Sequence, residues 1–183
     1  MTDYGASSYH RYLQGDDSAL EELVREYGDV LVRFAYCFLN DYYSAEDVME
    51  DTFATLIVKR KKFSERAKFK TYLFKIARNK CIDILRTRRK TVELEDNLSD
   101  LLSDSPESAA MLTDRNKMLY KSILKLTEAY RQVLILVYFE EFSIEETGKI
   151  LHKNRKQIYN LLSRARASLK EILIKEGINS ENI

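Results

Sequence analysis

The chain has few of the residues that break helices or carry catalysis. Its 183 residues include five Gly, one Pro, two Cys, two His and no Trp. Low Gly and Pro contents argue against a turn-rich β fold and favour long helices. No apolar run approaches the ~20 residues that a transmembrane helix needs. We therefore expect an all-α protein without membrane insertion or a signal peptide, located in the cytoplasm.

Patterns for catalysis and metal binding are also scarce. Cys37 and Cys81 lie at apolar helical positions without a CxxC pair, which favours core packing over redox or metal chemistry. His10 and His152 are too far apart in sequence to suggest a metal site. No Gly-rich phosphate loop, catalytic triad or distinct carboxylate pair is found. We expect a protein that is not an enzyme and that uses no cofactor and no small-molecule substrate.

Charge is strongly segregated although the formal net charge is only +1. Residues 59–90 carry 14 Lys or Arg against two acids, a local charge of +12. Residues 1–58 sum to −9, residues 91–110 to −6 and residues 111–183 to +4. Segregation of this kind indicates partners that contact one face at a time, and the basic block is suited to a polyanion.

Hydrophobic spacing predicts helices in the first half of the chain. Ser18 and Glu21 form a capping-box pattern before one helix or a pair of helices ending near Asn40. Ser44 is the expected N-cap of a helix with one apolar and one acidic face. Residues 59–68 are expected to form a loop or a frayed helix end, and a long helix with one basic face begins at Phe69.

The second half is separated by an acidic segment. Residues 91–105 contain no basic residue and are rich in Ser and Asp, which predicts a flexible linker between domains 1–90 and 106–183. Beyond it, Thr127 is the expected cap of a second helix, and Ser143 with Glu146 opens a short one. A tight turn then leads to a basic helix from Arg155, the spacing of a helix-turn-helix.

The start of that last helix is a candidate DNA reader. Seven basic residues and no acid lie between positions 149 and 170. Arg and Lys suit guanine, whereas Gln and Asn suit adenine. A solvated helix with incidental charge is the alternative. His152 occupies the turn position where Gly is common, and His tolerates positive φ better than most residues. The candidate side chains are Lys153, Arg155, Lys156, Gln157 and Asn160.

The basic block indicates phosphate binding, which supplies affinity without sequence choice. Phe63, Phe69 and Tyr72 could stack on unpaired bases. Phe69 and Tyr72 also fit the apolar stripe of the helix, so a buried role for at least one is the competing interpretation. A merely solvated basic face is the alternative for the whole block.

Five segments resemble the small sigma factors of bacterial RNA polymerase, the extracytoplasmic-function class. These are GDDSALEELVREY at 15–27, AEDVMEDTF at 45–53, FKTYLFKIARNKCIDILRTRRK at 69–90, LTEAYRQVLILVYFEEFSIEET at 126–147 and LLSRARASL at 161–169. The resemblance spans nearly the whole chain and implies a sigma-two domain, an acidic linker and a sigma-four domain. Gly148 and His152 depart from the more usual Ala and Gly.

The resemblance also implies site residues. An acidic helix would dock on the clamp of core RNA polymerase through Asp47, Glu50, Asp51, Phe53 and Leu56. The minus-ten promoter element would be bound by Arg60, Lys61, Lys62, Phe63, Lys70, Tyr72, Lys75, Arg78, Asn79 and Arg86. The minus-thirty-five element would be read by Lys153, Arg155, Lys156, Gln157, Asn160 and Arg164.

The function this implies is that of a sigma factor, which binds core polymerase, directs it to promoters and helps melt promoter DNA. The linker would pass through the RNA channel of the polymerase. The family often uses an anti-sigma factor, so such a protein is a candidate partner. Two alternatives from other classes stay open: a stand-alone helix-turn-helix regulator, and an RNA-binding or helical adaptor protein.

Overall fold

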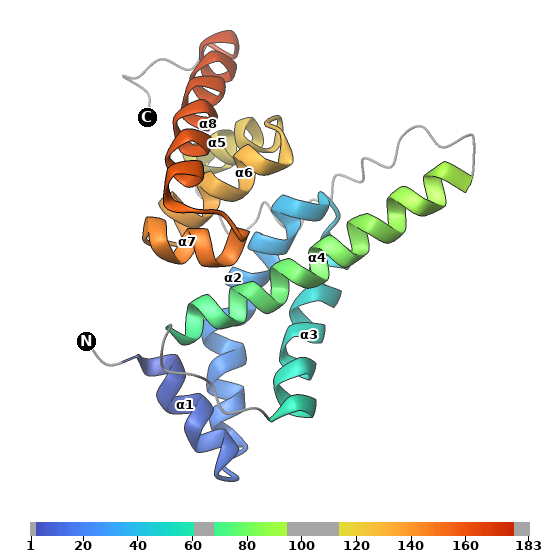
Figure 1. Cartoon of the computed structure of the whole chain (residues 1–183), viewed down its shortest axis with the longest axis vertical. Helices are drawn as coiled ribbons and strands as arrows, with labels where there is room; N and C mark the ends of the chain where they lie inside the picture. The colour runs from blue at the N-terminus through green and yellow to red at the C-terminus, as the bar shows by residue number, and fades with distance from the viewer. Residues whose placement is uncertain (1–2, 61–67, 95–113, 178–183) are drawn as a thin grey trace. The chain divides into compact units, whose positions relative to one another are not determined.

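The computed structural model describes residues 3–60, 68–94 and 114–177. Every regular element in these ranges is helical, which confirms the all-α prediction (Figure 1). The chain divides into two compact units, residues 1–102 (unit 1) and residues 103–183 (unit 2). Among the described helices, none is both long and apolar enough to cross a bilayer.

Unit 1 contains α1 (Tyr4–Leu13), α2 (Ser18–Leu39), α3 (Tyr42–Lys59) and α4 (Phe69–Leu94). The two predicted helix starts after the first helix need correction. Ser18 is the first residue of α2 and its hydroxyl donates to Asp16 at 2.6 Å, so it forms no capping box. Helix α3 begins at Tyr42 behind Asp41, and the Ser44 hydroxyl donates to that Asp41 carboxylate at 2.6 Å. In both places the N-cap residue is an Asp before the predicted Ser, Asp17 for α2 and Asp41 for α3, and neither Asp side chain accepts a cap hydrogen bond.

Helix α4 begins at Phe69 as predicted, and its end reaches into the expected linker. It continues to Leu94, so residues 91–94 are helical. The remainder of the predicted linker, residues 95–105, lies outside the described residues. The predicted domain limits at 90 and 105 therefore stay predictions.

The core of unit 1 is built on aromatic side chains around the start of α4. Phe69 is fully buried, with its ring centroid 5.2 Å from that of Tyr9 and 5.9 Å from that of Tyr27. Asp3 links two helices, because one carboxylate oxygen accepts from the Ala6 amide at 3.2 Å and the other from the Phe69 amide at 2.6 Å. Burial of large aromatic side chains is a major stabilising term in small helical domains. The start of α4 is thereby fixed to α1 and α2.

Both cysteines belong to this core. Cys37 on α2 and Cys81 on α4 are fully buried, as core packing predicts. In the described part of the chain, no cluster of His, Cys, Asp and Glu has the composition of a metal site.

Unit 2 contains α5 (Asp114–Leu124), α6 (Glu128–Leu134), a π-helical turn η2 (Ile135–Phe139), α7 (Ile144–Leu151) and α8 (Arg155–Lys175). Thr127 is the N-cap of α6, as predicted. The Ser143–Glu146 capping box forms with both of its hydrogen bonds. Helices α5, α6 and α7 each pack on α8. The core side chains include Val133, Leu136, Ile150, Ile158, Leu162 and Ala165.

Candidate nucleic-acid interface

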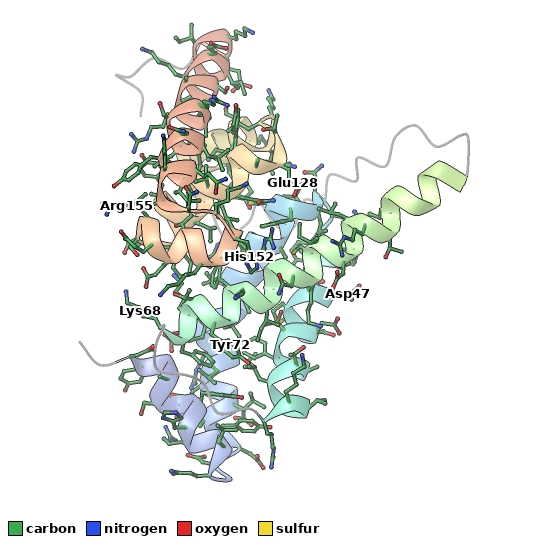
Figure 2. The ribbon with its side chains drawn as sticks, in the orientation of Figure 1. Asp47, Lys68, Tyr72, Glu128, His152 and Arg155 are labelled. Carbon is green, nitrogen blue, oxygen red and sulfur yellow. The ribbon has the colours of Figure 1, made fainter. Side chains whose placement is uncertain are left out.

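The turn between α7 and α8 is built from two special backbone positions. His152 ends α7 with φ 54°, in the left-handed region, which agrees with the expectation for this residue. The Lys153 amide donates to the Gly148 carbonyl at 2.9 Å. A Cβ placed at Gly148 would lie 2.6 Å from the Lys153 carbonyl oxygen, closer than real contacts allow. Glycine at position 148 therefore lets the turn fold back onto α7 (Figure 2 labels His152).

Helix α8 begins with a capping box that the sequence analysis missed. Asn154 is the N-cap, and its side-chain oxygen accepts from the Gln157 amide at 2.9 Å. In return, the Gln157 side-chain oxygen accepts from the Asn154 amide at 2.8 Å. The Asn-x-x-Gln spacing was visible in the sequence and is the signal that would have found it. Gln157, predicted to read a base, thus also holds the helix start, and its amide N–H donors remain for a partner.

All six residues predicted to bind the minus-thirty-five element are exposed, and they come together on and just before α8. The opposite face of α8 is buried through Ile158, Leu162 and Ala165. Lys156, Asn160 and Arg164 follow one another at four-residue spacing and so share one helical face. The first turn of α8 contains no acid. Cations at the N-terminus of a helix, the positive end of its dipole, are destabilising by themselves. An anionic partner is therefore favoured at this position.

The Arg155 side chain contacts residues of both α7 and α8. Its Nη1 lies 3.5 Å from Glu145 Oε1 on α7. Its Nη2 donates to the Tyr159 hydroxyl at 3.3 Å, and the guanidinium lies 5.6 Å from the centre of the Tyr159 ring. The hydrogen bond to Tyr159 is the largest cause of the raised pKa of Arg155. The Arg155 side chain, labelled in Figure 2, therefore bridges the two helices of the motif.

The second candidate surface follows α4. Lys75, Asn79 and Arg86 are exposed, and they recur at a spacing that puts them on one face of the helix. Lys70, Tyr72 and Arg78 are half-buried, and burial raises the pKa of Tyr72. The outward face of α4 thus carries Lys75 and Arg86, and exposed Asp83 lies on it 4.0 Å from Arg86.

Three of the remaining minus-ten residues cannot be placed. Lys61, Lys62 and Phe63 lie outside the described residues. Arg60, at the end of α3, is exposed, with φ 37° and its guanidinium 5.3 Å from the Tyr12 ring centre. Phe69 is 0% exposed, so it cannot stack on bases, and the competing interpretation of a buried role for at least one of Phe69 and Tyr72 is confirmed.

Two cations of the basic block are used inside unit 1. Lys80 forms a 3.0 Å ion pair with Asp51 of α3. Arg88 donates to Asp41 at 2.6 Å and to the Leu39 carbonyl at 3.3 Å. Burial alone would raise the pKa of Asp41, but hydrogen bonds from Ser44 and Arg88 outweigh burial and lower it. The Lys80 ion pair links α4 to α3, and the Arg88 hydrogen bonds link α4 to the corner between α2 and α3.

The acidic surface lies on α3. Asp47, Glu50 and Asp51 are exposed at helical spacing. Phe53 and Leu56 were predicted to share this docking surface, but they are only 5% and 1% exposed. A side chain buried within its own unit cannot offer its surface to a partner, so of the five predicted docking residues only the three acids remain candidates. Ile57 and Val58, 44% and 82% exposed, continue the helix beyond them.

Each of the two units matches a family model of known proteins. The family model for Sigma-70 region 2 matches residues 23–91, and that for Sigma-70, region 4 matches residues 116–169. The ECF RNA polymerase sigma factor SigW of Bacillus subtilis is 29% identical over 87% of this chain and 91% of its own length. The ECF sigma factor SigM of Bacillus subtilis is 29% identical over 88% of this chain and 99% of its own length.

A solved structure is similar as well. The sigma factor RpoE of Bartonella quintana, solved in complex with the anti-sigma factor NepR, has a TM-score of 0.72. The match is 25% identical and covers 84% of this chain and 95% of the other.

Proposed function

This chain belongs to the sigma-70 family of RNA polymerase sigma factors, in its extracytoplasmic-function class, and we propose the following division of work among its surfaces. The chain binds core RNA polymerase, directs it to particular promoters and helps melt the promoter DNA. The observation that supports this best is the order of three exposed surfaces: acidic on α3, basic on α4, and basic again at the capped start of α8.

The acidic surface of α3 is the proposed contact with the polymerase. Within the described residues neither Asp47 nor Glu50 forms an ion pair, whereas Asp51 is 68% exposed and paired with Lys80. Exposed carboxylates steer a basic partner surface and raise the rate of association. Phe53 and Leu56 contribute indirectly, because their buried side chains hold α3 against the core of unit 1.

The basic surface of α4 is the proposed contact with the minus-ten element. Lys75 and Arg86 would contact phosphates, and Asn79 between them would offer an amide to a base. Tyr72 is half-buried beside this face, which leaves part of its ring for a flipped base. Extruding a base from a duplex costs a few kcal/mol, so the basic surface must offset that cost by binding the open strand.

The start of α8 is the proposed reader of the minus-thirty-five element. Lys156, Asn160 and Arg164 would face the major groove, where Lys and Arg favour guanine and Asn favours adenine. Lys153 and the amide group of Gln157 lie at the edge of the same surface. Phosphates beside the helix start would be attracted by the helix dipole and the surrounding cations.

Three further points belong to the same proposal. The chain acts without catalysing a reaction, by binding the open promoter better than the closed one. It works in the cytoplasm, where its polymerase partner acts. An anti-sigma factor is a candidate partner, supported by the similarity to the Bartonella sigma factor that was solved with one.

Transcription with purified components tests the proposal. Core RNA polymerase is mixed with genomic DNA fragments, with and without this chain, and the transcript starts are mapped. We expect starts that depend on the chain and share two sequence elements at fixed spacing. Tight duplex binding without polymerase, together with half-site symmetry in a footprint, would instead indicate a stand-alone regulator. Preference for single-stranded nucleic acid alone would indicate an adaptor protein.

A further inference from the structure

Tyr159 was not selected from the sequence, yet it is exposed on α8 next to the proposed base readers. Its side chain is 48% exposed. It lies four residues after Arg155, so the two side chains are neighbours along the helix. Its hydroxyl accepts from Arg155 Nη2 at 3.3 Å, and its ring centre lies 5.6 Å from the guanidinium. Tyr159 therefore touches Arg155 through both its polar and its aromatic parts.

These contacts restrict a flexible side chain. A free Arg side chain samples many rotamers, and fixing it when it binds a base lowers affinity. Here the Tyr159 hydroxyl accepts from Nη2, its ring centre lies 5.6 Å from the guanidinium carbon, and Glu145 lies 3.5 Å from Nη1. Arg155 is thus oriented before DNA arrives. Its five N–H donors exceed these contacts, so donors remain for a base.

We infer that Tyr159 is a specificity-determining positioning residue, which orients Arg155 toward one base pair of the minus-thirty-five element. The inference rests on the proposed function. A preorganised guanidinium favours the base whose acceptors match its fixed direction, since matching then requires no further ordering. An unrestrained Arg155 would still attract phosphate but would distinguish bases less well.

The chain contains a matched control for this arrangement. The Arg166 guanidinium lies 5.3 Å from the ring centre of Tyr138, which belongs to the π-helical turn η2. Tyr138 is 49% exposed, nearly the same as Tyr159. Both pairs place an Arg guanidinium near a Tyr ring, but only the Tyr159 hydroxyl accepts from its Arg among the described residues, and Tyr138 lies outside the helix that is proposed to read DNA. Tyr138→Phe therefore shows what losing one exposed tyrosine hydroxyl does by itself.

The test uses holoenzyme assembled from core polymerase and the full chain. The probes are a promoter fragment found by start mapping and a set of fragments with single base-pair changes in its minus-thirty-five element. Tyr159→Phe should reduce discrimination roughly 2- to 10-fold at the base pair where Arg155→Ala relaxes it, the loss expected for one hydrogen bond. The double variant should match Arg155→Ala, and Tyr138→Phe should match the wild type. Equal weakening at every base pair, or an undiminished effect in the Arg155→Ala background, would overturn the inference.

A measurement on the free chain separates this inference from the proposed function. Arginine side-chain NMR reports rotation of each guanidinium without DNA or polymerase. Rotation of Arg155 should be slower in the wild type than in Tyr159→Phe, and rotation of Arg166 should be unchanged. Equal Arg155 rates would refute the positioning role even if the chain directs transcription. Wild-type holoenzyme without any base preference would instead refute the proposed function.

Discussion

Arg88 on α4 donates a 2.6 Å hydrogen bond to Asp41, a residue 47 positions earlier in the chain. The same guanidinium donates to the Ser44 hydroxyl at 2.7 Å and to the Leu39 carbonyl at 3.3 Å. The Arg88 guanidinium thus donates hydrogen bonds both to the last residue of α2 and to residues at the start of α3. Arg88 belongs to the basic block by sequence, but in the structure it fixes the helix that carries the block.

Asp41→Asn tests this link through its pH dependence. The pKa of Asp41 lies below its usual value of 3.8, because hydrogen bonds from Ser44 and Arg88 outweigh the opposing effect of burial. A lowered pKa gives stability that is present above the unfolded value and lost as pH falls through the folded value. Both side chains are partly exposed, so we expect Asn to cost about 0.5–1 kcal/mol of unfolding free energy at pH 7.

Urea unfolding at pH 7 and pH 3 measures the effect. The difference between wild type and Asp41→Asn should shrink toward the lower pH. Asp83→Asn is the control, because Asp83 is 75% exposed and lies 4.0 Å from its partner Arg86. A difference that stays constant with pH would show that the ion pair is not its source.

Gly148→Ala should destabilise unit 2. The added Cβ would lie 2.6 Å from a backbone oxygen that forms part of the turn, and backbone cannot move aside as a side-chain end can. We expect a loss of about 1–3 kcal/mol, the usual cost of forced overpacking. Gly28→Ala in α2 is the control, since its Cβ meets only Val24 Cγ1, at 4.0 Å. It should be neutral or stabilising by up to about 1 kcal/mol, from helix propensity. Thermal unfolding with these two signs reversed would contradict the turn geometry.

Asn160→Ala tests base reading at α8. Asn160 is exposed and lies outside the capping box, so its loss should leave the helix intact. We expect a cost of about 1–3 kcal/mol at one promoter and relaxed choice at one base pair. Gln157→Ala is predicted to lose specificity too, together with helix stability from the lost cap. Holoenzyme affinity for single-base-pair variants is the measurement. If Asn160→Ala weakened binding to all of these variants equally, Asn160 would contact phosphate and not a base.

Lys75→Ala tests the basic face of α4. Lys75 is exposed, so its contact with phosphate should weaken binding to all promoters alike and reduce the salt slope by about 1. Lys80→Ala is the matched control, because Lys80 is paired with Asp51 and only 24% exposed. Holoenzyme binding is titrated against salt concentration. An effect of Lys80→Ala as large as that of Lys75→Ala would mean that the outward face is not the binding surface.

Asp47→Lys and Glu50→Lys test the polymerase contact. Reversing two exposed charges on α3 should slow association with core polymerase roughly 10-fold or more at low salt, while the fold is kept. Asp29→Lys, an exposed acid on α2, is the control. Phe53→Ala should instead lower the unfolding free energy by about 3–5 kcal/mol, because it opens a cavity in the core. Core binding that is insensitive to both charge reversals would remove α3 from the docking surface.

Most of the fold could be predicted from short-range sequence patterns. The apolar stripes, the start of α4 at Phe69 and the Ser143 capping box all follow from short-range spacing, and the structure has them. Helix α1 was missed because its buried residues include Gly5 and Ser8, which give no apolar period. Phe53 and Leu56 were misplaced because a resemblance names positions and not the depth at which they lie.

Long-range pairing was beyond sequence reasoning. Nothing near Lys80 or Arg88 distinguishes them from the exposed cations beside them, and their partners lie 29 and 47 positions away. The same holds for Asp3, which caps α4 from 66 positions away. The contact of Tyr159 with Arg155 is local, and the four-residue spacing could have suggested it.

Promoter opening is the most direct test of the account. Permanganate reacts with unpaired thymines, so it reports melted DNA at a promoter found by start mapping. Core polymerase with the wild-type chain should make thymines near the minus-ten element reactive, and either component alone should not. Lys75→Ala together with Asn79→Ala should reduce that reactivity, while Lys80→Ala should leave it unchanged. Equal reactivity with core polymerase alone, or none with the wild-type chain, would contradict the account.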